Sequence, residues 1–75
     1  MSSTETSLKR QFGRRLQKLR IAKGITQEGL AAKVDLTVES ISNMERGIHG
    51  PSFDNLEKIA LALQVPAKTL FDFDE

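Results

Sequence analysis

The chain has 75 residues, the size of one small domain. This is near the lower limit for a domain that folds without disulfides or a structural metal. It contains no cysteine, which excludes disulfides and thiolate metal sites and leaves an aliphatic core to supply its stability. The net charge is only +1, but residues 1–34 carry eight basic and two acidic side chains, whereas residues 35–75 carry three and eight. This uneven distribution of charge suits a domain that binds phosphates with a basic side. Solvent-exposed Lys and Arg on a helix surface explain it equally well.

Membrane and export signals are missing from the sequence. No apolar run approaches the length that spans a bilayer, and no charged-then-apolar segment opens the chain. Together with the lack of cysteine, this predicts a cytoplasmic protein without a membrane partner.

The first predicted helix follows a polar start. Residues 1–7 are small and polar without periodicity, which predicts a disordered leader. Gly24 suits a left-handed helix end, and Lys23 places a positive charge in the last turn. Between the polar start and Lys23, four apolar side chains recur at helical spacing: Leu8, Phe12, Leu16 and Leu19.

Two short amphipathic helices are predicted next, over about residues 27–33 and 38–46. Each follows a hydroxyl residue suited to capping, Thr26 or Thr37. The connection between them is too short for an antiparallel hairpin, so the helices must cross steeply with Leu36 as an apolar plug beneath the turn. This arrangement predicts a helix-turn-helix, whose second helix enters the major groove of DNA.

The rest of the chain predicts two more helices. After a loop at 48–51, Ser52 caps a fourth helix over about 53–63, and Pro66 begins a short fifth helix that ends at about Phe71. Residues 72–75 form an acidic tail. The predicted fold is therefore all-α, with five helices over residues 8–71 and no strand.

From Phe12 to Phe71, the chain resembles the Cro/C1-type (XRE) helix-turn-helix family. The resemblance implies a compact five-helix lambda-repressor-like domain, a DNA-binding transcriptional regulator, and a place at the nucleoid. Small members include phage repressors and controller proteins of restriction–modification systems, and the opening Lys-Arg-Gln-Phe-Gly is similar to that of the controllers. The landmarks shared in order and spacing are Leu16, Arg20, Gly24-Ile25-Thr26-Gln27, Leu30-Ala31, Ile41-Ser42, Met44-Glu45-Arg46-Gly47, Pro51-Ser52, Leu56, Ile59-Ala60, Ala62-Leu63 and Val65.

Three residues depart from the family pattern. Asp35 in the turn and Gln64 after the fourth helix stand where glycine is usual, and a positive φ there costs roughly 1 kcal/mol or less for Asp. Gly29 lies inside the second helix, where it costs about 1 kcal/mol relative to Ala. We expect lower local stability and an unchanged fold.

The third predicted helix carries the candidate base contacts, Val38, Glu39 and Asn43. They face outward when Thr37, Ile41 and Met44 face the core. A valine methyl can pack on a thymine methyl, a glutamate can accept from cytosine N4, and an asparagine can pair with adenine. Two alternatives stay open: Glu39 suits the positive end of the helix dipole without touching DNA, and Val38 can be a tolerated surface residue.

Contacts to DNA phosphates are expected around the same helix. The resemblance implies that Gln27 binds a phosphate at the start of the second helix, where the dipole favours an anion. Ser42, Arg46 and His49 border the same surface. His49 is otherwise an ordinary loop histidine, because no second histidine and no cysteine is present to complete a metal site.

Arg20 and Glu45 have a different expected role. The resemblance implies a partly buried ion pair that joins the first helix to the end of the third. Arg20 is then a structural residue that sets the recognition helix, whereas an arginine in a basic helix would by default be solvated.

Enzymatic function is not predicted, because the sequence shows no nucleophile–base set, no glycine-rich phosphate loop and no metal cluster. We therefore expect no cofactor, no metal and no small-molecule ligand. The rival hypothesis is an antitoxin or co-activator-like module whose main ligand is a partner protein. Exposed Phe53, Leu61, Phe71 and Phe73 would serve such a partner or self-association.

A homodimer on a palindromic site in double-stranded DNA is expected. Three base-contacting residues on one recognition helix distinguish too few base pairs to find a site in a genome. Two such helices, one helical turn of DNA apart, read a palindrome. The acidic C-terminal half cannot face DNA comfortably and is free for pairing. Phe73 is the candidate expected to be most exposed, and the full set is Leu61, Val65, Leu70, Phe71 and Phe73, several of which belong to the core in the alternative interpretation.

Overall fold

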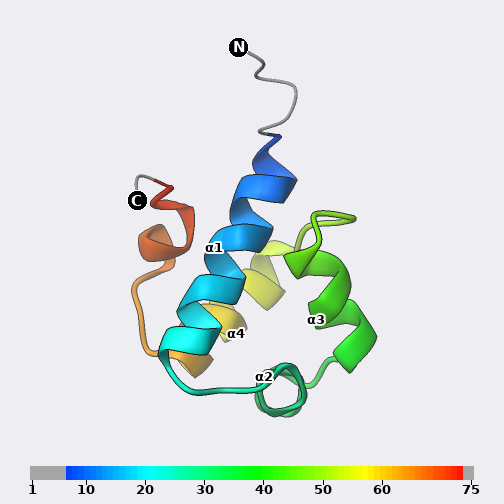
Figure 1. Ribbon diagram of the computed structural model, residues 1–75. Coiled ribbons are helices and arrows are strands. Elements are labelled where there is room, and N and C mark those ends of the chain that lie inside the picture. The colour runs from blue at the N-terminus through cyan, green and yellow to red at the C-terminus, as the bar shows by residue number, and fades with distance from the viewer. Residues whose placement is uncertain (1–6, 74–75) are drawn as a thin grey trace.

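The computed structural model describes residues 7–73, and the rest of the predicted leader and acidic tail (1–6 and 74–75) lies outside the described residues. Four α-helices follow one another, α1 (Leu8–Ala22), α2 (Gln27–Val34), α3 (Val38–Glu45) and α4 (Phe53–Leu63), and a 3₁₀ helix, η2 (Ala67–Phe71), comes last. Helix α1 runs through the middle of the domain, between α3 and η2 (Figure 1). The described part of the chain contains no strand, so the all-α prediction is confirmed.

Each α-helix begins at a hydroxyl side chain that accepts a hydrogen bond from a backbone N–H of the first turn. The three predicted caps are confirmed: Thr26 accepts from Gly29 N at 2.9 Å, Thr37 caps α3, and Ser52 caps α4. Ser7 caps α1 in the same way. A cap of this kind contributes typically about 1 kcal/mol.

A residue with positive φ follows each of the four described α-helices, and the left-handed end predicted at Gly24 is confirmed. Asp35 after α2 and Gln64 after α4 both have φ of 59°, and Gly24 after α1 has φ of 71°. After α2, the N–H of Leu36 donates to the carbonyl of Ala31 at 2.9 Å, which closes the turn and leaves Leu36 packed against the core.

The short fifth helix that was predicted is a 3₁₀ turn, so the described residues contain four α-helices and not five. The N–H of Thr69 donates to the carbonyl of Pro66 at 2.9 Å, three residues back. The Thr69 carbonyl accepts from Arg15 Nε of α1 at 3.0 Å, and Leu70 is fully buried. The segment has only five residues, a length typical of a 3₁₀ turn.

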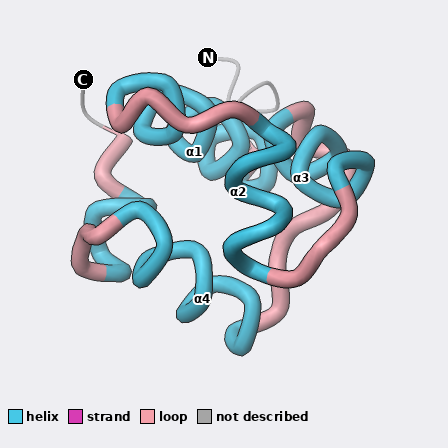
Figure 2. Tube along the Cα trace, turned by 90° about the horizontal axis from the view of Figure 1, so that it is seen from below, coloured by secondary structure: helices cyan, strands magenta, loops and turns pink. Residues whose placement is uncertain are grey.

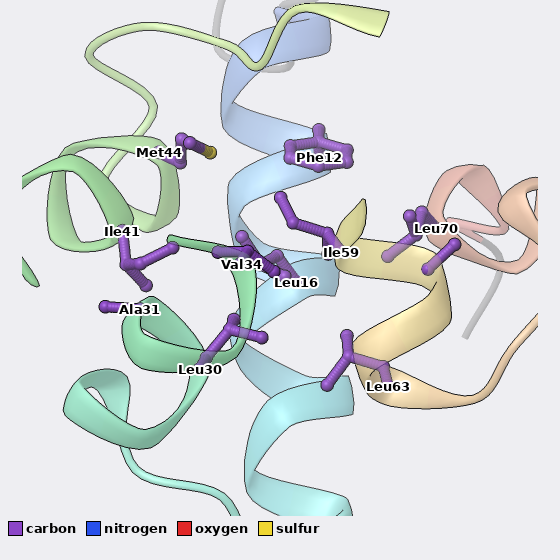
Figure 3. Close-up of a cluster of buried hydrophobic side chains, with 11 residues drawn as sticks. Phe12, Leu16, Leu30, Ala31, Val34, Ile41, Met44, Ile59, Leu63 and Leu70 are labelled. Atoms are coloured by element: carbon purple, nitrogen blue, oxygen red, sulfur yellow. The ribbon is translucent and has the colours of Figure 1, made fainter. Parts of the chain in front are cut away.

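Within residues 7–73, the core is formed by eleven buried apolar side chains from all five helical elements (Figure 3). Ile41 and Met44 are the two that α3 contributes, and both are almost fully buried. Helix α3 is therefore anchored along one side only, and its other side stays at the surface. The expectation that Thr37 also faces the core is wrong, because this residue caps α3 and is exposed. The members are Phe12, Leu16, Leu30, Ala31, Val34, Ile41, Met44, Ile59, Ala60, Leu63 and Leu70.

Helices α1 and α3 touch backbone to backbone at Gly13. A Cβ atom at this position would lie 2.6 Å from the carbonyl oxygen of Glu45 and still closer to that of Met44. Only a residue without a side chain fits there, so Gly13 sets how closely the C-terminal end of α3 approaches α1.

The predicted helix-turn-helix is formed by α2 and α3. Figure 1 views α2 nearly end-on while α3 lies across it, and Figure 2 shows α2 next to both α3 and α4. The steep crossing leaves α3 packed on α1 and α2 along one side, with its other side at the surface. Within residues 7–73, no helix combines the length and apolarity that a bilayer crossing requires.

Candidate nucleic-acid interface

The outward side of α3 presents the three predicted base-contacting residues. Val38 is 39% exposed and Glu39 is exposed, both in the first helical turn, and Asn43 is half-buried one turn further on. Within the described residues, no hydrogen bond uses the Asn43 side-chain amide. All three side chains are therefore free to reach a ligand that lies along α3.

The C-terminal end of α3 turns sharply against α1. Gly47 has φ of 76°, and a Cβ atom there would lie 2.8 Å from Cγ of Arg10, so the turn packs directly on the basic N-terminal half of α1. The N–H of Ile48 closes the turn on the carbonyl of Asn43 at 2.9 Å. Arg46 and His49 are exposed on either side of this turn, and both are predicted phosphate contacts.

The predicted ion pair between Arg20 and Glu45 is present. Arg20 Nε lies 2.6 Å from Glu45 Oε2, and Nη2 donates to Oε1 at 3.1 Å, so the guanidinium engages both carboxylate oxygens. Arg20 Nη1 also donates to the carbonyl of Ile25 at 2.8 Å. Both charged residues are only 8% exposed. The pair connects the end of α1 with the end of α3, and the Ile25 bond extends it to the segment before α2.

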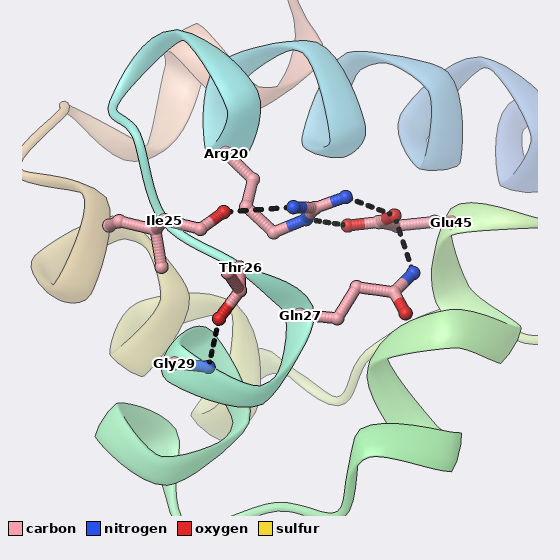
Figure 4. A network of polar contacts seen from close by, with 6 residues as sticks. All are labelled: Arg20, Ile25, Thr26, Gln27, Gly29 and Glu45. Carbon is pink, nitrogen blue, oxygen red and sulfur yellow. Dashed lines mark hydrogen bonds and ion pairs between the residues drawn. The ribbon is translucent and has the colours of Figure 1, made fainter.

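Gln27, the predicted phosphate contact at the start of α2, is tied to this ion pair. Its Nε2 donates to Glu45 Oε1 at 3.0 Å (Figure 4), and the residue is half-buried. This contact was not predicted, because nothing local relates two residues that lie 18 positions apart on different helices. Ser42, the remaining phosphate candidate, is half-buried in the middle of α3.

The predicted pairing residues separate into different environments. Leu70 has no exposed surface, so its assignment to a dimer interface is wrong, because its side chain belongs to the core. Val65 is half-buried against the core. Leu61 is 75% exposed and Phe71 is 39% exposed. Phe73 is half-buried with its ring 6.2 Å from that of Phe71, so the expectation that it is the most exposed candidate is also wrong.

The most exposed aromatic side chain in residues 7–73 is Phe53, at 88%. It lies at the start of α4, directly after the loop that follows α3. It borders a mostly apolar pocket of about 210 Å³ between the start of α1, this loop and η2, lined by Leu8, Lys9, Phe12, Gly50, Pro51, Phe53, Leu56 and Phe71.

Comparison with known proteins finds close relatives over most of the chain. The family model described as Helix-turn-helix (HTH_3) matches residues 16–70. The control protein C.BamHI of Bacillus amyloliquefaciens is 44% identical over 63 residues, which cover 83% of this chain and 78% of the relative. The control protein C.MunI of a Mycoplasma species is 40% identical over 65 residues, 85% of this chain and 88% of the relative.

A solved structure agrees with these sequence matches. The crystal structure of the restriction–modification controller protein C.AhdI from Aeromonas hydrophila superposes with a TM-score of 0.80 at 40% identity. The match covers 83% of this chain and 94% of the controller. The arrangement of α1 to α4 and η2 is thus similar to that of a controller protein of nearly the same extent.

Proposed function

This chain belongs to the helix-turn-helix (HTH_3) family, and we propose that it is a sequence-specific DNA-binding transcriptional regulator that controls a restriction–modification system. Members of this family regulate transcription and are not enzymes. The observation that carries the proposal is the similarity to controller proteins over nearly the whole domain, in a fold that leaves one side of α3 at the surface.

In the proposed complex, α3 lies in the major groove. Val38 packs on a thymine methyl group, Glu39 accepts a hydrogen bond from a cytosine amino group, and Asn43 pairs with an adenine edge. The exposure of Val38 and Glu39 and the free amide of Asn43 support these roles. Base edges rather than phosphates are the expected partners of this side, because a carboxylate repels the DNA backbone.

The DNA backbone is proposed to run past both ends of α3. Gln27 meets it at the start of α2, and Ser42, Arg46 and His49 meet it along and after α3. The exposure of Arg46 and His49, and the basic start of α1 packed against the same turn, support this assignment. These contacts supply affinity and orientation without reading sequence.

A two-fold homodimer is proposed to read a palindromic operator, since half-sites lie about 34 Å apart, one helical turn. Leu61, Val65, Phe71 and Phe73 remain candidates for pairing. Phe53, which the sequence already named for self-association, is a further candidate, because its exposed ring borders the apolar pocket between α1, α4 and η2. A two-fold contact there would insert each Phe53 into the partner's pocket, because a two-fold interface pairs the same surface of both subunits.

The test is selection of a binding site from a random duplex library, followed by fluorescence anisotropy on the selected and a scrambled duplex between 50 and 200 mM salt. A regulator keeps a preference of at least about 10³-fold for the selected duplex at the higher salt. An antitoxin or co-activator-like module whose main ligand is a protein would show no such preference, and its weak DNA binding would be lost as the salt rises.

A further inference from the structure

We propose that Glu45 is a positioning residue for DNA binding: it orients the Gln27 amide toward the DNA backbone, and Arg20 holds Glu45 in place to do so. The inference rests on the proposed DNA-binding function and names how one of its phosphate contacts is built. It assigns to the ion pair a role beyond joining two helices.

The contacts form one continuous path through three helices (Figure 4). Arg20, near the end of α1, binds both oxygens of Glu45, the last residue of α3. Glu45 Oε1 then accepts from Nε2 of Gln27, the first residue of α2, at 3.0 Å. The Arg20 contact with the Ile25 carbonyl, at 2.8 Å, holds the segment that leads into α2. The start of α2 and the end of α3 are therefore connected through the same carboxylate.

The chemistry of the partners determines which way the Gln27 amide points. An ionised carboxylate only accepts hydrogen bonds, so the Gln27 NH₂ group, and not its carbonyl oxygen, must face Glu45. One N–H is then bound to Glu45, and the second N–H remains on the same nitrogen. A phosphate oxygen is also purely an acceptor, so this orientation presents the donor that a phosphate needs.

The arrangement also avoids a repulsion that a lone glutamate would cause. An uncompensated carboxylate beside the phosphate backbone would weaken DNA binding. Here the bidentate guanidinium neutralises Glu45, and both groups are 8% exposed, so the pair presents little net charge to the backbone. Gln27 thus stands as a neutral, preoriented donor in front of a buried ion pair.

The size of the effect follows from the conformational freedom of glutamine. Ordering one flexible side chain on binding lowers affinity by about 2- to 10-fold, a loss that a preoriented side chain avoids. Glu45→Gln retains the size of the side chain but removes the charge that selects the amide orientation. We therefore expect this variant to bind the selected duplex about 2- to 10-fold more weakly.

The experiment is a double-mutant cycle on DNA affinity with Glu45→Gln and Gln27→Ala, measured where circular dichroism shows all four proteins folded. If Glu45 acts through Gln27, Glu45→Gln lowers affinity in the wild-type background and has little effect in the Gln27→Ala background. An equal loss in both backgrounds would show that Glu45 acts only through the fold and would overturn the inference.

A second measurement needs no variant to fold. ¹⁵N relaxation of side-chain amides in the free wild-type protein should show the Gln27 NH₂ group more ordered than that of Gln17, an exposed glutamine of α1. Equal mobility of the two groups would refute the positioning role. If wild-type protein prefers no duplex, the proposed function fails and this inference with it, whereas failure of the inference alone leaves wild-type binding intact.

Discussion

Replacing Gly13 by alanine is expected to destabilise the domain, although alanine is the better helix former. Gly13 is within α1, where exchange for Ala would by propensity alone stabilise the helix by up to about 1 kcal/mol. The new Cβ, however, would lie 2.6 Å from the carbonyl oxygen of Glu45 and closer still to that of Met44. These are backbone atoms, so no side-chain rotation relieves the overlap.

The magnitude follows from the separation that the helices must gain. Ordinary contact begins at 3.4 Å, so the α1 and α3 backbones must move apart by about 1 Å in a close-packed core. Overpacking of this kind costs roughly 1–3 kcal/mol, and backbone partners place Gly13→Ala at the upper end. After the gain in propensity, we expect a net loss of about 2 kcal/mol. In a domain of this size, that loss lowers Tm by roughly 8–16 °C.

The assay is thermal and urea unfolding followed by circular dichroism at 222 nm, with Gly29→Ala as the matched control in α2. A Cβ at Gly29 would meet only side-chain atoms, Thr26 Oγ1 at 3.2 Å and Ile25 Cγ2 at 3.3 Å. The higher helix propensity of alanine then stabilises the domain while the tight packing destabilises it. The free energy of unfolding should therefore change by no more than about 0.5 kcal/mol. A Gly13→Ala protein as stable as wild type would refute the backbone-contact argument.

Four further outcomes are expected. Removing Arg20 or Glu45 alone should cost about 3 kcal/mol by urea unfolding, because each strands a buried charge, and the double variant should lose less than the sum; additivity would mean that the pair is not coupled. Asn43→Ala should weaken binding of the selected duplex by about 1–3 kcal/mol and relax the preference at one base pair. Unchanged anisotropy titrations would show that Asn43 contacts no base. Arg46→Ala should weaken selected and scrambled duplexes alike and reduce the salt slope by about one, whereas an altered base preference at the same slope would contradict a phosphate contact. Phe53→Ala should weaken dimerisation in sedimentation equilibrium without unfolding the subunit, since the ring is 88% exposed in the single chain; dimerisation as strong as that of wild type would exclude the Phe53 surface.

Local sequence determined where the helices begin and end. The caps at Thr26, Thr37 and Ser52 and the left-handed turns at Asp35 and Gln64 all depend on residues within five positions of each other. Hydrogen bonds of the first turn and steric limits on φ act at that range, so they can be predicted from the chain alone.

Periodicity likewise determined which side of α3 faces the core. Ile41 and Met44 recur at helical spacing and are buried, which leaves Val38 and Glu39 outside. The ion pair between Arg20 and Glu45 was predicted only through resemblance to a family, because 25 residues separate its partners and no local rule joins them.

Tertiary packing alone decided the remaining features. Leu70 lies in the core rather than at an interface, and the short fifth helix is a 3₁₀ turn. Gly13 lies where the α1 and α3 backbones touch, and the Gln27 amide donates a hydrogen bond to Glu45. Each depends on how closely two helices approach, a distance set by the whole core at once, whereas caps and periodicity need only the neighbouring residues.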